Sequence, residues 1–399
     1  AIIDMPEIIK IKKGLNLKLK GKAVEEVLNL GAEGFFAIKP VDFINITPKL
    51  LVNEMDEVYA GTPLFFSKAD PRIKFCSPVS GKIKEIIRGD KRKLLEIIIE
   101  SNGKLQSLDK KTFPETPSKE EILNNLLEFG YWAAIRQRPF NVIANPDQCP
   151  KAIFISGFDS SPLAPNFEFI FSNRINEIQK GIDILSKLTE GKIHFSVHQE
   201  LNSDNSVFKK LENIEYHIFS GPHPAGNIGT QIHHIDPVNK GELVWTVNLA
   251  DVANIGEFFL KGEPTYKKTI SVVGSEAETA KYYQVISGVS VTSISKNISL
   301  NTRVISGNVL TGTNVGNNGF LGYYENMFTL IPEGDYYEFF GWAMPGFNKL
   351  SLSRTFWSWL TPNREYKVDT NYHGELRNFV VTGQYEKVFP WDIMPQQLI

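Results

Sequence analysis

The sequence predicts a multidomain α+β protein, and three observations support this. Residues 9–100 contain short stretches that alternate apolar with basic residues, or are rich in β-branched residues, and that end at Gly or Pro. From Lys151 onward strands alternate with helices, which is typical of a parallel sheet with helices on its faces. Residues 266–330 return to short β segments between turns containing Gly and Asn. We therefore expect four parts, with bounds 1–111, 112–265, 266–338 and 339–399.

Length and charge agree with several domains. The chain has 399 residues, 42% of them hydrophobic, which is enough for roughly two to four domains with separate cores. Residues 1–111 contain 20 Lys and Arg against 15 Asp and Glu, whereas the remainder contains 23 against 30. This asymmetry can orient a protein against an anionic surface or an acidic partner, but it can equally be a solvated face of a small sheet domain. We expect no nucleic-acid partner.

The cysteines and the apolar runs limit which sites and compartments are expected. Cys76 and Cys149 stand far apart without other ligands nearby in the sequence, which excludes an iron–sulfur or Cys-rich zinc site within this chain and indicates a reducing compartment. No apolar run reaches the roughly 18 residues of a membrane span. The best stretch, which begins at Leu243, is interrupted by Asn248, Asp251, Asn254 and Glu257. The first residues, AIIDMPE, lack the basic start of a secretion signal, so we read them as a short leader.

The first domain contains two strand–turn–strand units, GTPLFF and SPVSGKIKEII, that are expected to face each other. Lipoyl and biotinyl carriers, and barrel-sandwich hybrids generally, share this pattern, and the carriers place a modified lysine at a hairpin tip between small or methionine residues. Lys68 lies at such a tip, SKADPR, where Pro71 fixes the turn, but it lacks those flanking residues. We therefore expect Lys68 to be solvated and unmodified.

A helix and an arginine pair open the second domain. Ser118 can cap the helix, Glu121 completes a capping box, and Gly130 ends it. The following stretch, GYWAAIRQRPF, places Arg136 and Arg138 near aromatic residues that include Phe140. Such a pair can hold an anionic or planar ligand by bidentate hydrogen bonds and stacking, or it can bridge two domains.

The central region has the βαβ pattern of a nucleotide-binding fold without its phosphate-binding motif. KAIFISG, KIHFSV and EYHIFSG read as strands, and NRINEIQKGIDILSKL has apolar residues at helical spacing. A dinucleotide fold would show G-x-G-x-x-G after the first strand, whereas this chain has FDSSPLAP. We therefore predict a Rossmann-like α/β domain that lacks a dinucleotide fingerprint.

The densest polar stretch is SGPHPAGNIGTQIHHIDPV, from Ser220 to Val238. Gly226 permits close backbone approach and Thr230 offers a hydroxyl. Four of the seven histidines, His217, His223, His233 and His234, fall within eighteen residues. A metal site needs three converging ligands, and in a strand IHHI the two adjacent histidines would point to opposite faces. We therefore expect no metal, and leave open a ligand loop, a partner loop and a purely structural loop.

The last two parts are a compact β module and an aromatic tail. YKKTISVVG, KNISLNTRVISGNVLTGT and GFLGYYENMFTLI predict short strands of an α+β module of the β-grasp type. The tail FGWAMPGFNKLSLSRTFWSWL is rich in aromatic residues, which either pack on another domain or await a partner. The chain stops at MPQQLI without a helix stop signal, which predicts a truncated C-terminal segment.

Seven motifs together resemble one family. Their order, from about residue 9 to 395, is similar to that of the A subunits of the bacterial sodium-translocating NADH:quinone oxidoreductases. One difference is GTQIHH, where the family usually has GTHIHF, so that Gln231 replaces a histidine; the family also continues beyond MPQQLI. The motifs are IKIKKGLNL, FCSPVSGKI with RGDKR, GYWAAIRQRPF, SGPHPAGNIGTQIHHIDPV, RVISGNVLTGT, FGWAMPGFNKLS and GQYEKVFPWDI.

The resemblance implies a peripheral subunit on the cytoplasmic face of the bacterial inner membrane. Other subunits of such a complex carry electrons from NADH through flavins and iron–sulfur centres to quinone while Na⁺ crosses the membrane. The family combines a barrel-sandwich hybrid without lipoyl or biotin, a Rossmann-like domain and a β-grasp module of the soluble-ligand-binding type. It is associated with quinone binding and with docking on the membrane-embedded B subunit.

Two functions remain open from the sequence. In the first, the chain binds quinone, ubiquinone or menaquinone, but holds no flavin and no iron–sulfur cluster, so it has no redox chemistry of its own. In the second, it is a scaffold that binds no small molecule. A free-standing NAD- or flavin-dependent oxidoreductase is a third class, and would need a bound cofactor. The expected quinone-binding residues are Arg136, Arg138, Phe140, His223, Gly226, Thr230 and His233.

Overall fold

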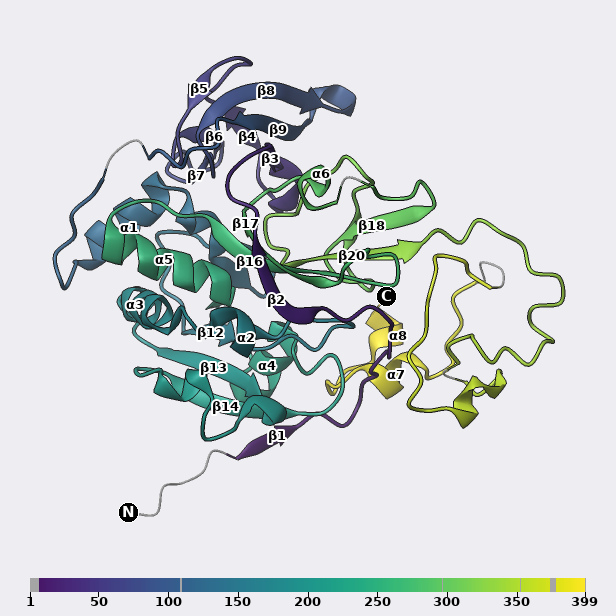
Figure 1. Cartoon of the computed structure of the whole chain (residues 1–399). Coiled ribbons are helices and arrows are strands. Elements are labelled where there is room, and N and C mark those ends of the chain that lie inside the picture. The colour runs from purple at the N-terminus through teal and green to yellow at the C-terminus, as the bar shows by residue number, and fades with distance from the viewer. Residues whose placement is uncertain (1–6, 108–109, 296, 352, 374–377, 399) are drawn as a thin grey trace.

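The computed structural model describes residues 7–107, 110–295, 297–351, 353–373 and 378–398. Except for Glu7, the stretch read as a leader lies outside these residues. The described chain contains a seven-, a six-, a four- and a three-stranded sheet (Figure 1). The two smaller sheets form a module at one end of the molecule, and the seven- and six-stranded sheets form its body (Figure 1).

The amino-terminal β module pairs two small antiparallel sheets. Leu64, Phe65 and Ile97 are fully buried between them. The four-stranded sheet contains β3 (Phe35–Ile38), β9 (Leu94–Ser101), β8 (Gly81–Arg88) and β5 (Glu57–Val58), and the three-stranded sheet contains β4 (Pro48–Leu50), β6 (Pro63–Ser67) and β7 (Lys74–Cys76). Lys68 follows β6 and is exposed in the turn, as the sequence predicted.

The seven-stranded sheet confirms the predicted βαβ pattern. Its order is β1-β14-β13-β12-β15-β10-β11; neighbours from β1 to β15 run parallel, and β10 and β11 are antiparallel additions. The predicted strands KAIFISG, KIHFSV and EYHIFSG are all present. The strands are β1 (Ile8–Lys10), β10 (Arg136–Arg138), β11 (Val142–Ile143), β12 (Ala152–Ser156), β13 (Lys192–His198), β14 (Glu215–Ser220) and β15 (Val244–Thr246).

Helices cover both faces of this sheet, because its central strands are apolar on both sides. On one face α3 (Ile175–Ser186) packs against α5 (Leu249–Lys261). On the other face α4 (Ile228–Ile235) places Ile232 against Phe154. Two further helices, α1 (Lys119–Glu128) and α2 (Phe167–Phe171), precede β10 and follow β12.

The predicted boundaries of α1 are confirmed by its caps. The Glu121 backbone N–H donates to Ser118 Oγ at 3.2 Å, and the Ser118 backbone N–H donates to Glu121 Oε2 at 2.8 Å. This is the predicted capping box, which satisfies two backbone donors that the helix leaves unpaired. Gly130 has φ 74°, a left-handed conformation that ends the helix.

The first thirty residues do not belong to the amino-terminal β module alone. β1 pairs with β14 in the α/β sheet, and β2 (Val24–Asn29) pairs with β17 in the six-stranded sheet. The alternation in IKIKKGLNLKL predicted a longer strand, but the strand ends at Lys10. Gly21 allows the chain to cross between sheets, since it has φ 98° and a Cβ there would lie 2.3 Å from the Gly274 carbonyl. The residues before β3 therefore contribute one strand to each of the two larger sheets.

The six-stranded sheet contains the strands predicted in residues 266–330. Its order is β19-β18-β20-β16-β17-β2, with β16 parallel to β20 and antiparallel to β17. A short helix, α6 (Val291–Ile294), follows β17. The strands are β16 (Lys267–Val273), β17 (Lys281–Ile286), β18 (Thr302–Ser306), β19 (Thr313–Asn314) and β20 (Met327–Pro332).

The strand considered at IHHI does not form, because these residues end helix α4. Ile228, Ile232 and Ile235 recur at helical spacing and contact the apolar cluster on the sheet. His233 and His234 are therefore adjacent on a helix, with ring centroids 5.1 Å apart, rather than on opposite faces of a strand.

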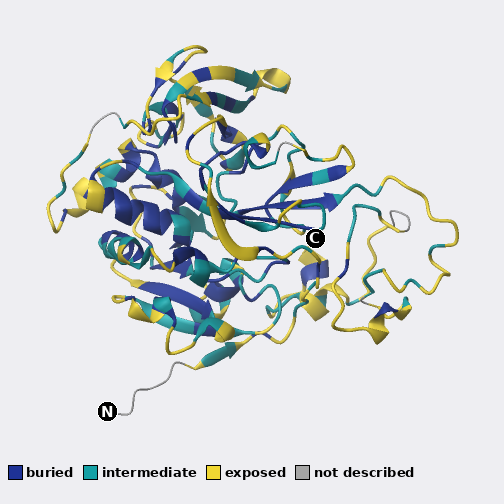
Figure 2. Cartoon of the chain, in the orientation of Figure 1, coloured by how far each residue is buried: buried dark blue, intermediate teal, exposed yellow. Residues whose placement is uncertain are grey.

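The carboxy-terminal segment has little regular structure, and much of its backbone is coloured as exposed or intermediate in Figure 2. It contains a 3₁₀ helix (Trp357–Leu360), α7 (Tyr385–Val388) and α8 (Pro395–Leu398). Tyr337 and Phe339 are 104% and 89% exposed. Among the helices of the described ranges, none combines the length and the apolar character needed to cross a bilayer.

Candidate functional site

A cavity of about 600 Å³ lies at the carboxyl ends of β12 and β15. From β12 the chain continues to β13 and β14 on one side and later returns to β15 on the other side. The gap between β12 and β15 is therefore the point where the strand order reverses, and open α/β sheets bind ligands in the crevice outside this point. Ser156, Phe158 and Asp159 line the cavity after β12, and Thr246, Val247 and Asn248 line it after β15.

Other modules supply the remaining walls. Lys268 and Thr269 come from β16, and residues 324–326 come from the loop before β20. Phe389, Pro390 and Trp391 of the carboxy-terminal segment also line the cavity. The cavity is therefore an interdomain site, because neither sheet encloses it alone.

Two arginines of β10 face this cavity from the same side of the strand. The Arg136 guanidinium lies 4.4 Å from the centroid of the Tyr324 ring, a cation–π arrangement. Within the described part of the chain Arg138 Nε is buried and has no hydrogen-bond partner. Burial, and secondarily the charge of Arg136, lowers the pKa of Arg138 to about 10. A buried donor without a partner is suited to a bound acceptor such as a carbonyl oxygen.

Buried charges of both signs face the arginines. Asp251 lies in the first turn of α5 and is 5% exposed, and Lys268 is 4% exposed. Burial raises the pKa of Asp251 and lowers that of Lys268, while each group's charge partly offsets the shift of the other. Burial likewise raises the pKa of Glu325. These carboxyl groups retain protons to higher pH than exposed ones.

The loop between β14 and α4 forms the wall nearest β12. A Cβ at Gly226 would lie 2.4 Å from the Ser160 backbone nitrogen, so glycine permits this close approach. The Gly226 backbone N–H donates to Ser160 Oγ at 2.7 Å. Thr230 is buried on α4 and borders the cavity. Gln231 lies behind this wall and donates through Nε2 to Ser156 Oγ at 2.8 Å.

Comparison with known proteins identifies the family. Three family models match: "NqrA N-terminal barrel-sandwich hybrid domain" over residues 9–102, "NqrA second alpha/beta domain" over 117–264 and "NQRA C-terminal domain" over 269–317. The NqrA protein of the Na(+)-translocating NADH-quinone reductase from Neisseria meningitidis serogroup B is 37% identical over 400 residues, covering 98% of this chain and 88% of that protein. The chain belongs to the NqrA family. It is therefore one component of a multi-subunit oxidoreductase.

Other NqrA relatives match to a similar extent. Those of Vibrio alginolyticus and Yersinia pestis are 35% and 34% identical to the chain, and each comparison covers 98% of this chain and 88% of the relative. A solved NAD⁺-reducing [NiFe]-hydrogenase aligns over 58% of this chain and 52% of its own, with 11% identity and a TM-score of 0.36. That likeness is too distant to bear on function. The matches to NqrA models confirm the barrel-sandwich and α/β parts predicted from sequence.

Four of the seven residues expected at the site of this NqrA chain line the cavity: Arg136, Arg138, Gly226 and Thr230. Phe140 is instead 79% exposed on the β10–β11 turn. His223 lies beside the cavity wall, with Nδ1 3.0 Å from Ser160 Oγ, and His233 stacks on Trp391 at 5.5 Å between centroids. The last two support the wall without lining it.

Sequence reasoning missed the buried charges of this site. Asp251 was noted only as an interruption of an apolar run, yet it follows a parallel strand and opens a helix, which is the signal for the carboxyl edge of a sheet. Lys268 alternates with Ile270 and Val272 along β16, so the period of two could have placed it on the buried face of that strand. Tyr324, not a sequence neighbour, is the aromatic partner of Arg136.

Proposed function

We propose that this NqrA chain binds the quinone of a sodium-translocating NADH:quinone reductase in the cavity at the carboxyl edge of its α/β sheet. The observation that carries the proposal is the cavity's position where the strand order reverses, since ligands of open α/β sheets bind there. Its volume of about 600 Å³ is in the usual range for small-molecule sites. The relatives' name, NADH-quinone reductase, supplies the substrate class.

The lining suits a flat ring with two carbonyl oxygens. Phe167, Ile170 and Phe171 of α2 present apolar surface to the cavity. Arg138 and Thr230 offer donors to the carbonyl oxygens, and Arg138 Nε has no other partner within the described residues. A quinone head group bound here would replace water at these donors and cover the apolar wall.

Quinone reduction consumes two electrons and two protons for each hydroquinone formed. The carboxyl groups of Asp251 and Glu325, whose pKa values burial raises, are placed to give protons to the quinone oxygens. We propose that the electrons come from other subunits, and that this chain holds no flavin and no iron–sulfur cluster. Its two cysteines, Cys76 and Cys149, are both free thiols.

Titration of the purified chain with a short-tailed ubiquinone or menaquinone analogue tests this proposal. The expected result is saturable binding in the micromolar range or weaker, reduced in Arg138→Gln and unchanged in Arg92→Gln. Arg92 is the matched control because it is an exposed arginine of the amino-terminal β module, outside the residues that line the cavity. Equal affinity of all three proteins would refute the cavity as the quinone site.

The exposed aromatic side chains of residues 336–351 and 353–360 support a second role, docking on a membrane partner. Tyr337, Phe339 and Trp342 are 104%, 89% and 73% exposed, and exposed apolar patches mark interaction sites. We propose that the membrane-embedded B subunit of the complex covers this surface and that the chain sits peripherally on the cytoplasmic face of the bacterial inner membrane. If the titration shows no quinone binding, this contact alone would leave a scaffold function.

Copurification with the B subunit tests the docking role separately. A chain with Phe339→Ser and Trp342→Ser is expected to lose the contact while binding the quinone analogue normally. Undiminished copurification would contradict the assignment of this surface. Both residues are exposed, so the substitutions leave the buried core intact.

The finer fold assignments belong to the same proposal. The parallel strands around β12 support a Rossmann-like domain, and the loop after β12 lacks the glycine cradle of a dinucleotide site. The mixed six-stranded sheet supports a β-grasp module of the soluble-ligand-binding type. The exposed Lys68 is expected to carry neither lipoyl nor biotinyl group, which an intact mass would check.

A further inference from the structure

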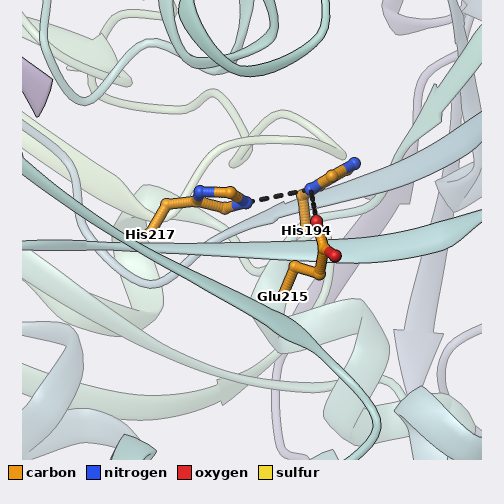
Figure 3. Close-up of side chains that lie close together, drawn as sticks. All are labelled: His194, Glu215 and His217. Carbon is orange, nitrogen blue, oxygen red and sulfur yellow. Dashed lines mark hydrogen bonds and ion pairs between the residues drawn. The ribbon is translucent and has the colours of Figure 1, made fainter. Parts of the chain in front are cut away.

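Three side chains with metal-ligating atoms lie close together on two neighbouring strands of the α/β sheet (Figure 3). They are on the face that carries α4, because the His194 ring stacks on Phe154, which clusters with Ile232 of that helix. His194 comes from β13, and Glu215 and His217 come from the neighbouring parallel strand β14. His194 stands directly opposite Glu215 in the strand register, and His217 follows two residues later on the same face. All three lie in the amino-terminal halves of their strands, at the edge of the sheet opposite the cavity.

The ligand atoms are already close to the spacing of a coordinated ion. His194 Nδ1 lies 2.9 Å from His217 Nε2 and 3.5 Å from Glu215 Oε2. The ligand atoms of all three residues lie within 4.8 Å of one another. A tetrahedral zinc ion with bonds of about 2.0–2.2 Å separates its ligands by about 3.3–3.5 Å. A small rotation of the two rings would therefore admit an ion.

The surroundings fix these side chains and keep the imidazoles neutral. The His194 ring stacks on Phe154, with centroids 4.6 Å apart. Lys192 binds Glu215 Oε1, so that Oε2 is directed toward His194. Burial lowers the pKa of both histidines, that of His217 to about 4, and a neutral imidazole is the form that coordinates metals. The other nearby charges, Lys151 and Asp236, are paired with each other at 2.6 Å.

A simple hydrogen bond between the two imidazoles is the competing interpretation. One neutral imidazole can donate a hydrogen bond to the other, while Glu215 forms an ion pair with Lys192 alone. In this interpretation the carboxylate oxygen, 3.5 Å from the same nitrogen, makes only a weak electrostatic contact, whereas a metal ion would use it as a third ligand. Two imidazoles and a carboxylate around one point are the donor set of borderline transition-metal ions, not of Na⁺, Mg²⁺ or Ca²⁺, which prefer oxygen ligands.

We propose that His194, Glu215 and His217 form a binding site for a divalent transition-metal ion, with Zn²⁺ as the best match and water completing its coordination. Three protein ligands and one open position are the pattern of accessible zinc sites. The ion would link β13 to β14, and its binding would stabilise the folded α/β domain. This site is independent of the quinone proposal, because it shares no residue with the cavity.

Sequence reasoning expected no metal because it sought ligands within one histidine-rich stretch. Of those four histidines only His217 is at this site; its partner His194 lies twenty-three residues earlier. His223 bonds Ser160, and His233 stacks on Trp391, so the stretch divides among three places in the fold. Strand pairing, not sequence proximity, forms the cluster.

Metal titration of the metal-free full chain, with any affinity tag removed, tests the site. Co²⁺ serves as the visible probe and is then displaced by Zn²⁺. Wild type is expected to bind one equivalent, and Zn²⁺ is expected to raise its Tm, whereas Mg²⁺ and Na⁺ should do neither. Glu215→Gln and His217→Gln should each weaken Zn²⁺ binding about tenfold or more.

His198→Gln is the matched control, because His198 is on β13 and on the same face but outside the cluster. It should bind Zn²⁺ as wild type does. The proposal is overturned if wild type binds Zn²⁺ no more tightly than the Glu215→Gln and His217→Gln variants. Circular dichroism would show whether each variant folds. Because Glu215 is 38% exposed, the Glu215→Gln variant is expected to fold, and the test stays decisive even if the His217→Gln variant does not.

Discussion

The carboxyl edge of the α/β sheet and the face of the sheet beneath α3 and α5 are built from the same strands, but the edge contains buried polar groups and the face is packed with apolar side chains. On the covered face, Phe195 of β13, Ile182 of α3 and Phe258 of α5 are all completely buried in one apolar core. At the carboxyl edge, Arg138 and Asp251 each carry a buried polar atom that lacks a partner within the described chain. Apolar packing on the covered face stabilises the fold, whereas the edge also presents polar groups to the cavity.

This difference indicates where substitutions should act. Unpaired buried polar groups cost stability, and those of Arg138 and Asp251 belong to residues that line the cavity, where a bound ligand can satisfy them. Core substitutions should therefore lower the stability of the chain without changing ligand binding. Substitutions at the edge should change ligand binding with little effect on stability.

The largest expected effect is on the covered face. Phe195→Ala removes a fully buried ring and should lower the free energy of unfolding by about 3–5 kcal/mol. Denaturant unfolding would measure this loss. Quinone-analogue affinity should be unchanged under conditions where the variant is folded. A loss below about 1 kcal/mol would contradict the packing described for this face.

The next effect concerns ligand binding at the edge. Arg138→Met should weaken quinone-analogue binding about tenfold, which corresponds to about 1.4 kcal/mol, because it removes a buried donor. Its free energy of unfolding should stay within about 1 kcal/mol of wild type, since besides burial it is the like charge of Arg136 that lowers the pKa of Arg138. Arg92→Met is the control. If Arg138→Met instead lost stability but bound the quinone analogue as wild type does, the result would favour a structural role in which the arginines bridge two domains.

A smaller effect is the pH dependence of stability at Asp251. Its folded-state pKa is raised above 3.8, chiefly by burial, so the folded chain holds this proton more tightly than the unfolded chain. Its contribution to stability therefore falls as pH rises from about 4 through the raised pKa, by about 1.4 kcal/mol for each tenfold difference in proton affinity between the two states. Lys268 and Arg136 oppose the rise in pKa without reversing it.

Urea unfolding from pH 5 to 8 would compare wild type with Asp251→Asn. The variant should gain stability relative to wild type as pH rises. Asp204→Asn, at a 104% exposed position, is the control and should run parallel to wild type. A constant difference between Asp251→Asn and wild type would show that this carboxyl has no raised pKa.

The smallest expected effect is at Phe140. Its ring is 79% exposed on a turn outside the cavity, so Phe140→Ala should change stability by less than about 0.5 kcal/mol and leave quinone-analogue binding unchanged. Weakened binding in this variant would mean that the ligand extends from the cavity onto the turn. The same titration as for Arg138 would measure it.

Local patterns predicted the elements well because they act over a few residues. The capping box at Ser118 and Glu121 determined the start of α1, and periodicity identified α3 and the parallel strands. Periodicity left IHHI undecided, because so short a stretch fits a strand as well as a helix, and packing against the Phe154 cluster accompanies the helix that forms. Periodicity also could not show that β1 pairs with β14 of the α/β sheet, because the pattern within a strand does not specify which sheet edge the strand joins.

The sites were only partly predictable, because strand pairing and domain packing assemble them. Arg136 and Arg138 were found since both lie in one strand with a recognisable charge pattern. Tyr324 and Trp391, which line the same cavity, come from distant parts of the chain. His194 had no local signal at all, and only its register with Glu215 reveals it.

Photolabelling with a quinone analogue that carries a photoreactive group on its ring would test the cavity most directly, with labelled peptides mapped by mass spectrometry. The predicted result is labelling within residues 156–171, 224–230 and 246–251, suppressed by excess unlabelled quinone and reduced in Arg138→Met. Two results would contradict binding at the carboxyl edge of the sheet. One is labelling confined to the exposed aromatic side chains of the carboxy-terminal segment, and the other is labelling that excess unlabelled quinone does not suppress.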